Sequence, residues 1–133
     1  MKFLIALLIS TPVLGFAQNT DASYYRFWQG FKKEGLSESA FMKELPTFMK
    51  DTVTLYKGKG LSNYIVVIPP KDKPAHIPDE FALVAFDSEK SYRTVRETPE
   101  GANYSARHWD VFAKETSKSA TLKSGPINFE ENV

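Results

Sequence analysis

Three segments of this chain have the short period of a β-strand, yet they present apolar side chains on both faces. Residues 24–33 place aromatic rings at odd and even positions alike, and residues 64–68 and 81–86 are apolar without interruption. A strand with one solvated face would instead alternate apolar and polar residues. The pattern therefore predicts a sheet that needs cover on both of its faces.

The segment between the first two strands has the spacing of an amphipathic helix. Its apolar residues recur every three or four positions over residues 41–56. Ser37 is placed to cap its first turn, and Lys57-Gly58 supplies residues typical of a helix end. Pro46 lies inside this segment, and we expect it to kink or divide the helix because proline lacks the amide hydrogen.

A second helical region follows the third strand. Ser88 is placed to cap its first part, and Thr98 caps a restart in which Pro99 takes the first helical position and the helix runs to about Phe112. The last strand is expected over residues 120–124. The order strand, helix, strand, strand, helix, strand predicts an α+β, ferredoxin-like βαββαβ fold with a four-stranded antiparallel sheet.

Two helices can cover only one face of such a sheet. Apolar side chains left in water on the other face would forfeit several kcal/mol, at about 25 cal/mol per Å². A contiguous apolar patch typically marks an interface. We therefore expect a homodimer in which this face meets the sheet of a second copy. The substitution Val66→Asp or Val67→Asp, at whichever valine faces the partner, should then split the dimer or unfold it.

The first seventeen residues have the pattern of a cleaved export signal. Lys2 precedes an almost wholly apolar run, and Gly15-Phe16-Ala17 places small residues at the two positions that a signal peptidase reads. The run is shorter than the roughly 20 residues of a membrane span, and Pro12 interrupts it. Since no cysteine follows it, a lipoprotein anchor is excluded. We expect a bacterial protein with a Sec-type signal, periplasmic or secreted and without a membrane anchor.

The expected organisation is a signal peptide (1–17), a short polar segment (18–23), one ferredoxin-like α/β barrel domain (24–127) and an acidic tail (128–133). Lys2 is the only charged residue of the signal, so the remaining 116 residues carry 16 basic and 16 acidic side chains. A net charge of zero argues against nucleic acid as a partner. Because the chain has no cysteine, its core must stabilise the fold without disulfides.

The region around the third strand resembles a known superfamily. Residues 77–89, followed by Tyr92-Arg93, residues 98–101, Tyr104 and His108-Trp109, are similar to the third strand and second helix of dimeric α/β barrel proteins. With the preceding strand, helix and strand, the resemblance covers nearly all of the predicted mature chain. It implies two ferredoxin-like subunits packed sheet against sheet around a barrel. Members include monooxygenases that work without a metal, haem-handling enzymes, isomerases and proteins without known activity, so the resemblance selects no chemistry.

Arg26 and Trp28 are candidate ligand-binding residues in the first strand, and Tyr64 is a candidate in the second. Arg26 and Trp28 share a face of their strand. If that face lines the barrel, a guanidinium beside an indole suits an acidic or aromatic small molecule. If it lies against a helix, Trp28 belongs to the core and Arg26 reaches water at an edge. Because both faces are apolar, the sequence leaves both alternatives open.

His108 lies on the same helical stripe as Tyr104 and Phe112, where a histidine needs a hydrogen-bond partner. One interpretation is a core histidine satisfied by a backbone carbonyl or a nearby acid. The other makes it a general base, or a haem ligand as resemblance to the haem-binding members implies. The second histidine, His76, lies in a proline-flanked loop, so we expect no metal site.

Two functions of different kinds are consistent with these residues. The first is an exported, non-catalytic dimer that binds a small apolar or aromatic ligand, or a protein partner, and needs no cofactor. The second is a monooxygenase or haem-handling enzyme that uses His108, with haem as its possible cofactor. We favour the first. The ligand-binding candidates are Arg26, Trp28, Tyr64, Tyr104 and His108.

Overall fold

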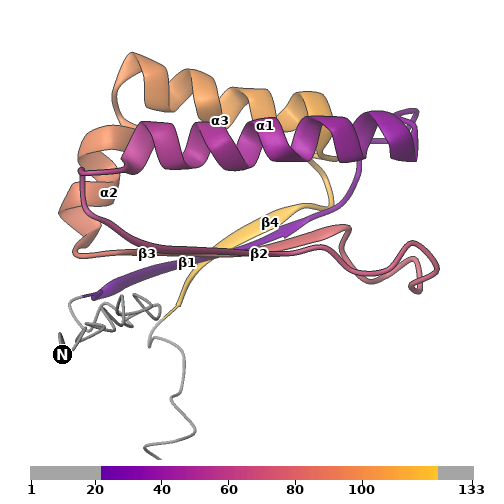
Figure 1. The fold of residues 1–133 in the computed structure, drawn as a ribbon, viewed down its shortest axis with the longest axis horizontal. Coiled ribbons are helices and arrows are strands. Elements are labelled where there is room, and N and C mark those ends of the chain that lie inside the picture. The colour runs from indigo at the N-terminus through magenta and orange to yellow at the C-terminus, as the bar shows by residue number, and fades with distance from the viewer. Residues whose placement is uncertain (1–21, 123–133) are drawn as a thin grey trace, which may run out of the picture.

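The computed structural model describes residues 22–122. In this part of the chain, four strands and three helices follow in the predicted order, and the second helical region forms two helices (Figure 1). The predicted signal peptide, most of segment 18–23 and the acidic tail lie outside the described residues and stay predictions. The elements are β1 (Tyr24–Gly30), α1 (Glu38–Tyr56), β2 (Leu61–Val67), β3 (Glu80–Phe86), α2 (Glu89–Arg96), α3 (Pro99–Val111) and β4 (Lys118–Leu122).

The four strands form one antiparallel sheet in the order β2-β3-β1-β4. Trp28 of β1 lies opposite Ala82 of β3 on one side and opposite Ser119 of β4 on the other. The register of β2 against β3 shifts between Leu61 and Asn63. The predicted α+β, ferredoxin-like fold is confirmed.

The first strand is shorter than predicted, because it ends at Gly30 and not at residue 33. The next two backbone amides bond to side chains instead of a neighbouring strand. The amide of Phe31 donates to the Ser117 hydroxyl at 2.9 Å, and that of Lys32 donates to the Asp79 carboxylate at 2.6 Å. The amide of Lys33 then donates to the backbone carbonyl of Val111 at the end of α3.

Pro46 does not divide α1, which is one helix of 19 residues. Proline removes the hydrogen bond to the carbonyl of Met42, one turn earlier. Both Pro46 and Met42 are exposed, so water can reach that carbonyl. The three predicted caps are confirmed: Ser37, Ser88 and Thr98 each accept a backbone hydrogen bond at the start of α1, α2 and α3.

The core lies between the sheet and the three helices, which all cover the same face (Figure 1). Its residues form two clusters, one where α1 meets the end of α3 and one where α1 meets α2. The first contains Phe41, Leu45, Phe48, Val111 and Phe112, and the second contains Tyr24, Tyr56, Phe86 and Val95.

No described element covers the opposite face of the sheet (Figure 1). Its side chains come from alternate strand positions, and Ile65 and Val67 are 47% and 54% exposed there. The rings of Phe27 and Phe81 stack on this face with centroids 5.9 Å apart. An apolar face without helix cover is what the strand pattern predicted. We call its central residues the open-face patch: Tyr25, Phe27, Ile65, Val67, Phe81 and Leu83.

Candidate functional site

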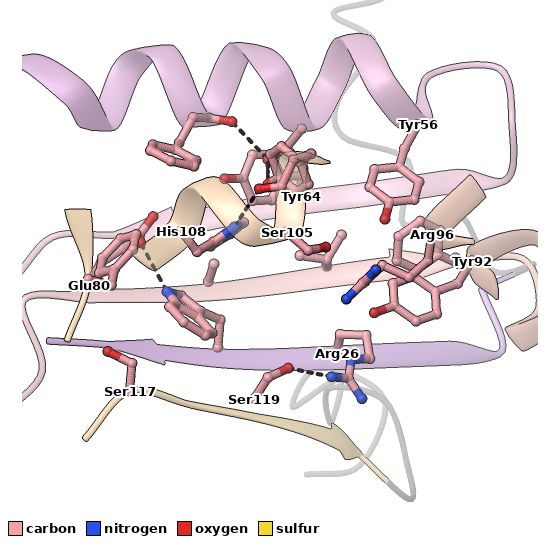
Figure 2. A pocket seen from close by; sticks show the side chains of 18 of the residues that line it. Arg26, Tyr56, Tyr64, Glu80, Tyr92, Arg96, Ser105, His108, Ser117 and Ser119 are labelled. Carbon is pink, nitrogen blue, oxygen red and sulfur yellow. Dashed lines mark hydrogen bonds between the residues drawn. The ribbon is translucent and has the colours of Figure 1, made fainter. Parts of the chain in front are cut away.

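A pocket of about 250 Å³ lies between the sheet and the helices of the same chain (Figure 2). The four strands form one wall, and residues of α1, α2 and α3 form the other. The five ligand-binding candidates from the sequence come together here. They are Arg26, Trp28, Tyr64, Tyr104 and His108.

This position differs from a lumen between the sheets of two subunits, where the barrel hypothesis placed a binding cavity. Arg26 and Trp28 share a face, as predicted, and it is the face that the helices cover. Trp28 nevertheless lines a pocket instead of being sealed in the core. Its strand neighbours are the small residues Ala82 and Ser119, which leave space above the sheet beside the indole. The face thus lies against the helices, as in the second alternative, but Trp28 lines a pocket there instead of being sealed in the core.

Glu80 places a buried carboxyl in the wall of the pocket. It is 4% exposed, and Oε2 accepts a hydrogen bond from Nε1 of Trp28 at 3.2 Å. Burial raises the pKa of Glu80 to about 7, although the hydrogen bond from Trp28 lowers it in part. The carboxyl therefore changes charge near neutral pH. We missed this residue because the third strand was predicted to begin at residue 81. The alternation of Glu80 with Ala82 and Val84 is the sequence signal for it.

His108 projects from α3 into the pocket (Figure 2). Nδ1 lies 3.0 Å from the carbonyl oxygen of Tyr104, so this nitrogen carries the hydrogen and donates it. Burial lowers the pKa of His108, while its bonds to the backbone of Tyr104 and Ser105 oppose that shift. The neutral ring then has its lone pair on Nε2. A backbone carbonyl is the partner that the simpler interpretation expected, and Nε2 is left as a hydrogen-bond acceptor.

The surroundings of His108 do not fit haem. Four aromatic rings lie 4.8 to 6.1 Å from the imidazole, measured between centroids, and they belong to Trp28, Phe48, Tyr104 and Phe112. A porphyrin could not approach this imidazole without displacing them. Residues 22–122 contain no group of three or more His, Asp or Glu side chains that could hold a metal ion. The same residues contain no helix that is long and apolar enough to cross a membrane.

Two phenol groups enter the pocket from opposite walls, Tyr64 from β2 and Tyr104 from α3. Thr52 donates its hydroxyl hydrogen to the carbonyl of Phe48 at 2.8 Å, so its oxygen accepts from the hydroxyl of Tyr104. Burial raises the pKa of Tyr64 to about 12 and that of Tyr104 further. Both phenols are therefore neutral near pH 7.

Two arginines lie at the opposite end of the pocket from Glu80 and His108 (Figure 2). Arg26 comes from β1 and Arg96 from the last turn of α2. The guanidinium of Arg26 lies 5.5 Å from the centroid of the Tyr92 ring. Arg96 was not predicted as a site residue, and nothing in its local sequence distinguishes it from other basic residues of a helix end. The pocket is therefore polarised, with cationic groups at one end and a carboxyl and an imidazole at the other.

Comparisons with known proteins find similarity in fold only. No protein-family model matches the sequence, and a search of the curated proteins finds no match. Solved structures do match, and three illustrate the range of their descriptions.

A dimeric ferredoxin-like protein of unknown function from Jannaschia sp. CCS1 is 10% identical with a TM-score of 0.61. The match covers 76% of this chain and 98% of that one. An ethyl tert-butyl ether D family protein from Bacillus halodurans is 14% identical with a TM-score of 0.58, covering 77% and 100%. A protein described as an antibiotic biosynthesis monooxygenase is 11% identical with a TM-score of 0.55, covering 78% and 100%.

Identities this low carry no information about ligand or chemistry. The structural matches confirm the predicted fold: the chain has a ferredoxin-like fold.

Proposed function

We propose that this protein binds a small, largely apolar or aromatic molecule in the pocket between its sheet and its helices. The composition of the pocket carries this proposal. Trp28, Phe48, Phe86 and Tyr104 supply aromatic surface, and a small number of polar groups converge on it. Small-molecule sites typically combine apolar walls with a few placed polar groups. Burying an aromatic ligand against these rings gains about 25 cal/mol per Å² of apolar surface.

We also propose that two copies pair through the open-face patch. Exposed apolar side chains at Ile65 and Val67 support this, because pairing would remove them from water. The related fold from Jannaschia sp. CCS1 is described as dimeric. If the patch instead binds another protein, light scattering of the purified chain will give the mass of a monomer.

The N-terminal pattern supports export, with cleavage after residue 17 and release into the periplasm or the medium without a membrane anchor. N-terminal sequencing of the protein recovered from the periplasm tests this. A first residue of Gln18 agrees with the proposal, whereas an intact Met1 contradicts it.

Isothermal titration calorimetry with 2-naphthamide, a neutral aromatic molecule, tests ligand binding. We expect a dissociation constant on the order of 100 μM, consistent with the usual efficiency of a ligand of this size. Ser105→Phe should abolish binding by filling the pocket, since Ser105 lines it on α3. Ala106→Phe is the matched control, because Ala106 is exposed on the next position of the same helix. Absence of binding to the unsubstituted protein, or equal loss in both variants, would contradict the proposal.

A second candidate function is a monooxygenase that works without a bound cofactor. It is favoured by the neutral imidazole of His108, whose Nε2 can accept a proton from a hydroxyl group of a bound substrate. Oxygen uptake with a quinol substrate tests it. Uptake that is lost in His108→Gln, with unfolding unchanged, would support this candidate, and no uptake above background would remove it.

A further inference from the structure

We propose that the ligand of this pocket carries an acidic group, bound between the guanidinium groups of Arg26 and Arg96. The inference rests on the proposed function and narrows its ligand class to small apolar or aromatic acids. It depends on three observations: the way Arg26 is held, the position of Arg96, and the distribution of charge along the pocket.

Arg26 is held in a fixed orientation by two hydroxyl groups of β4. Nη1 donates to Oγ1 of Thr121 at 2.8 Å, and Nη2 donates to Oγ of Ser119 at 2.5 Å. The Tyr92 ring supports the guanidinium from one side. Two of its five N–H groups are used in these bonds, so others remain for a ligand. A guanidinium that is already oriented loses less entropy when it binds a carboxylate.

Arg96 brings a second positive charge to the same end of the pocket (Figure 2). Tyr56 lies close to both arginines. Burial and the neighbouring Tyr92 raise the pKa of Tyr56 to about 12, and the charges of Arg96 and Arg26 each partly oppose this rise. Two cations facing one space repel each other, and an anion placed between them removes the repulsion.

Neither arginine forms an ion pair with a described residue. The ion pairs within residues 22–122 join Lys73 to Asp79, Arg93 to Glu89 and Arg107 to Asp51. The hydroxyls that hold Arg26 are neutral partners, so they leave its charge uncompensated. This arrangement suits binding of an anion, because hydrogen bonds between a guanidinium and a carboxylate are charge-assisted and strong.

The charge distribution also orients the ligand. The hydrogen bonds of Arg26 lie in an exposed region, while Glu80 at the other end is buried. An acidic group would meet repulsion beside Glu80 whenever that carboxyl is ionised. The ligand therefore places its acidic group at the arginine end, and its apolar body extends past Trp28 toward His108.

A comparison of 2-naphthoate with 2-naphthamide tests this inference by calorimetry on the full chain at low ionic strength. The two molecules have nearly the same shape and differ in charge. We expect naphthoate to bind at least tenfold more tightly, the effect of one charge-assisted hydrogen-bonded pair. Arg96→Gln should reduce this preference for naphthoate over naphthamide at least threefold, measured as the ratio of the two dissociation constants in the same variant.

Arg93→Gln is the matched control, because Arg93 lies on the same helix with its side chain 60% exposed and paired with Glu89. It should keep the full preference for naphthoate. Arg26→Gln is a second test, but its hydroxyl bonds also tie β1 to β4, so its unfolding must be measured alongside. Equal affinities for the two molecules, or equal losses in Arg96→Gln and Arg93→Gln, would overturn the inference. If naphthamide binds in those cases, the proposed function stands, and if neither molecule binds, both fail.

Discussion

The two faces of the sheet are both apolar in sequence, but the structure places different groups on them. The face under the helices carries Arg26, Tyr64 and Glu80 among its apolar residues, and these three side chains line the pocket. The opposite face carries the six apolar residues of the open-face patch, with Gln29 and Lys118 beside them on the same face. The two faces therefore differ in cover: the polar residues under the helices line a pocket, whereas Ile65 and Val67 of the open face stay exposed.

The largest expected effect comes from a charge in the open-face patch. Val67→Asp should convert the dimer to a monomer at micromolar concentration, because each dimer would bury two carboxylates without partners. Of the two valines proposed from the sequence, Val67 lies on the open face, where it is 54% exposed, and Val66 points toward the helices. Light scattering should show the mass fall by about half while circular dichroism keeps its folded spectrum.

Val53→Asp is the control for this substitution. Val53 is an apolar residue of α1, 39% exposed and far from the open face. The variant should keep the mass of the unsubstituted protein. If Val67→Asp also keeps that mass, the open face is not the dimer interface.

The next prediction compares two truncations, one phenylalanine on each face of the sheet, to separate folding from assembly. Phe86→Ala should lower the free energy of unfolding by about 3–5 kcal/mol, as expected for a large buried side chain. Phe86 is 1% exposed beneath the helices. Phe81→Ala on the open face should instead weaken pairing, so light scattering over a dilution series should show the dimer dissociating at a higher protein concentration than the unsubstituted protein. A dimer as tight as that of the unsubstituted protein would contradict the division between the two faces.

The sequence predicted the elements and their caps because these depend on local spacing. Ser37, Ser88 and Thr98 each precede a helical pattern, and each caps a helix in the structure. The faces of the sheet were harder to assign. When both faces are apolar, alternation shows that Arg26 and Trp28 lie together but not which side the helices take. That choice depends on the packing of whole elements.

Two residues of the candidate site, Glu80 and Arg96, were not predicted, and the reasons differ. Glu80 lies at the boundary of β3, and strand boundaries shift by one or two residues with the side-chain bonds around them. Arg96 reaches the pocket only because α2 packs against the end of the sheet, where the ring of its Tyr92 contacts Phe86 of β3. His108 could be nominated, since a histidine on an apolar stripe is unusual in sequence, but its enclosure by aromatic rings could not.

The helix-covered face should also make stability depend on pH through Glu80. An unfolded glutamic acid ionises near pH 4.5, whereas the raised pKa of folded Glu80 keeps its proton up to about pH 7. Between these values ionisation favours only the unfolded chain, so the free energy of unfolding falls as pH rises. The fall amounts to about 1.4 kcal/mol per pH unit and at most about 3 kcal/mol in total. Above pH 7 both states are ionised and the contribution stays constant.

Glu80→Gln should remove this dependence, so its unfolding free energy relative to the unsubstituted protein should rise from pH 4.5 to pH 7 and then stay level. Urea unfolding at several pH values measures the difference. The lowered pKa of His108 makes the unfolding free energy rise with pH, but this contribution is the same in Glu80→Gln and in the unsubstituted protein, so it cancels in the difference. Glu97→Gln, at an exposed carboxyl, is the control and should leave the slope intact. A slope that is unchanged in Glu80→Gln would show that this carboxyl is already ionised in the folded protein.

The smallest expected effects come from two serines, Ser117 and Ser119, on the same side of the sheet, one affecting stability and the other ligand affinity. Ser119 bonds to the guanidinium of Arg26, whereas the hydroxyl of Ser117 accepts from the backbone amide of Phe31 at 2.9 Å. Ser119→Ala should raise the dissociation constant for 2-naphthoate about two- to fivefold and leave unfolding within about 0.5 kcal/mol, because it only loosens the ligand-binding arginine. Ser117→Ala should leave the affinity for 2-naphthoate unchanged and cost about 1 kcal/mol of stability, since it removes the partner of the half-buried Phe31 amide. If Ser119→Ala instead destabilises the fold and leaves the affinity for naphthoate unchanged, Arg26 ties β1 to β4, and the polar groups of the helix-covered face belong to the sheet and not to its ligand.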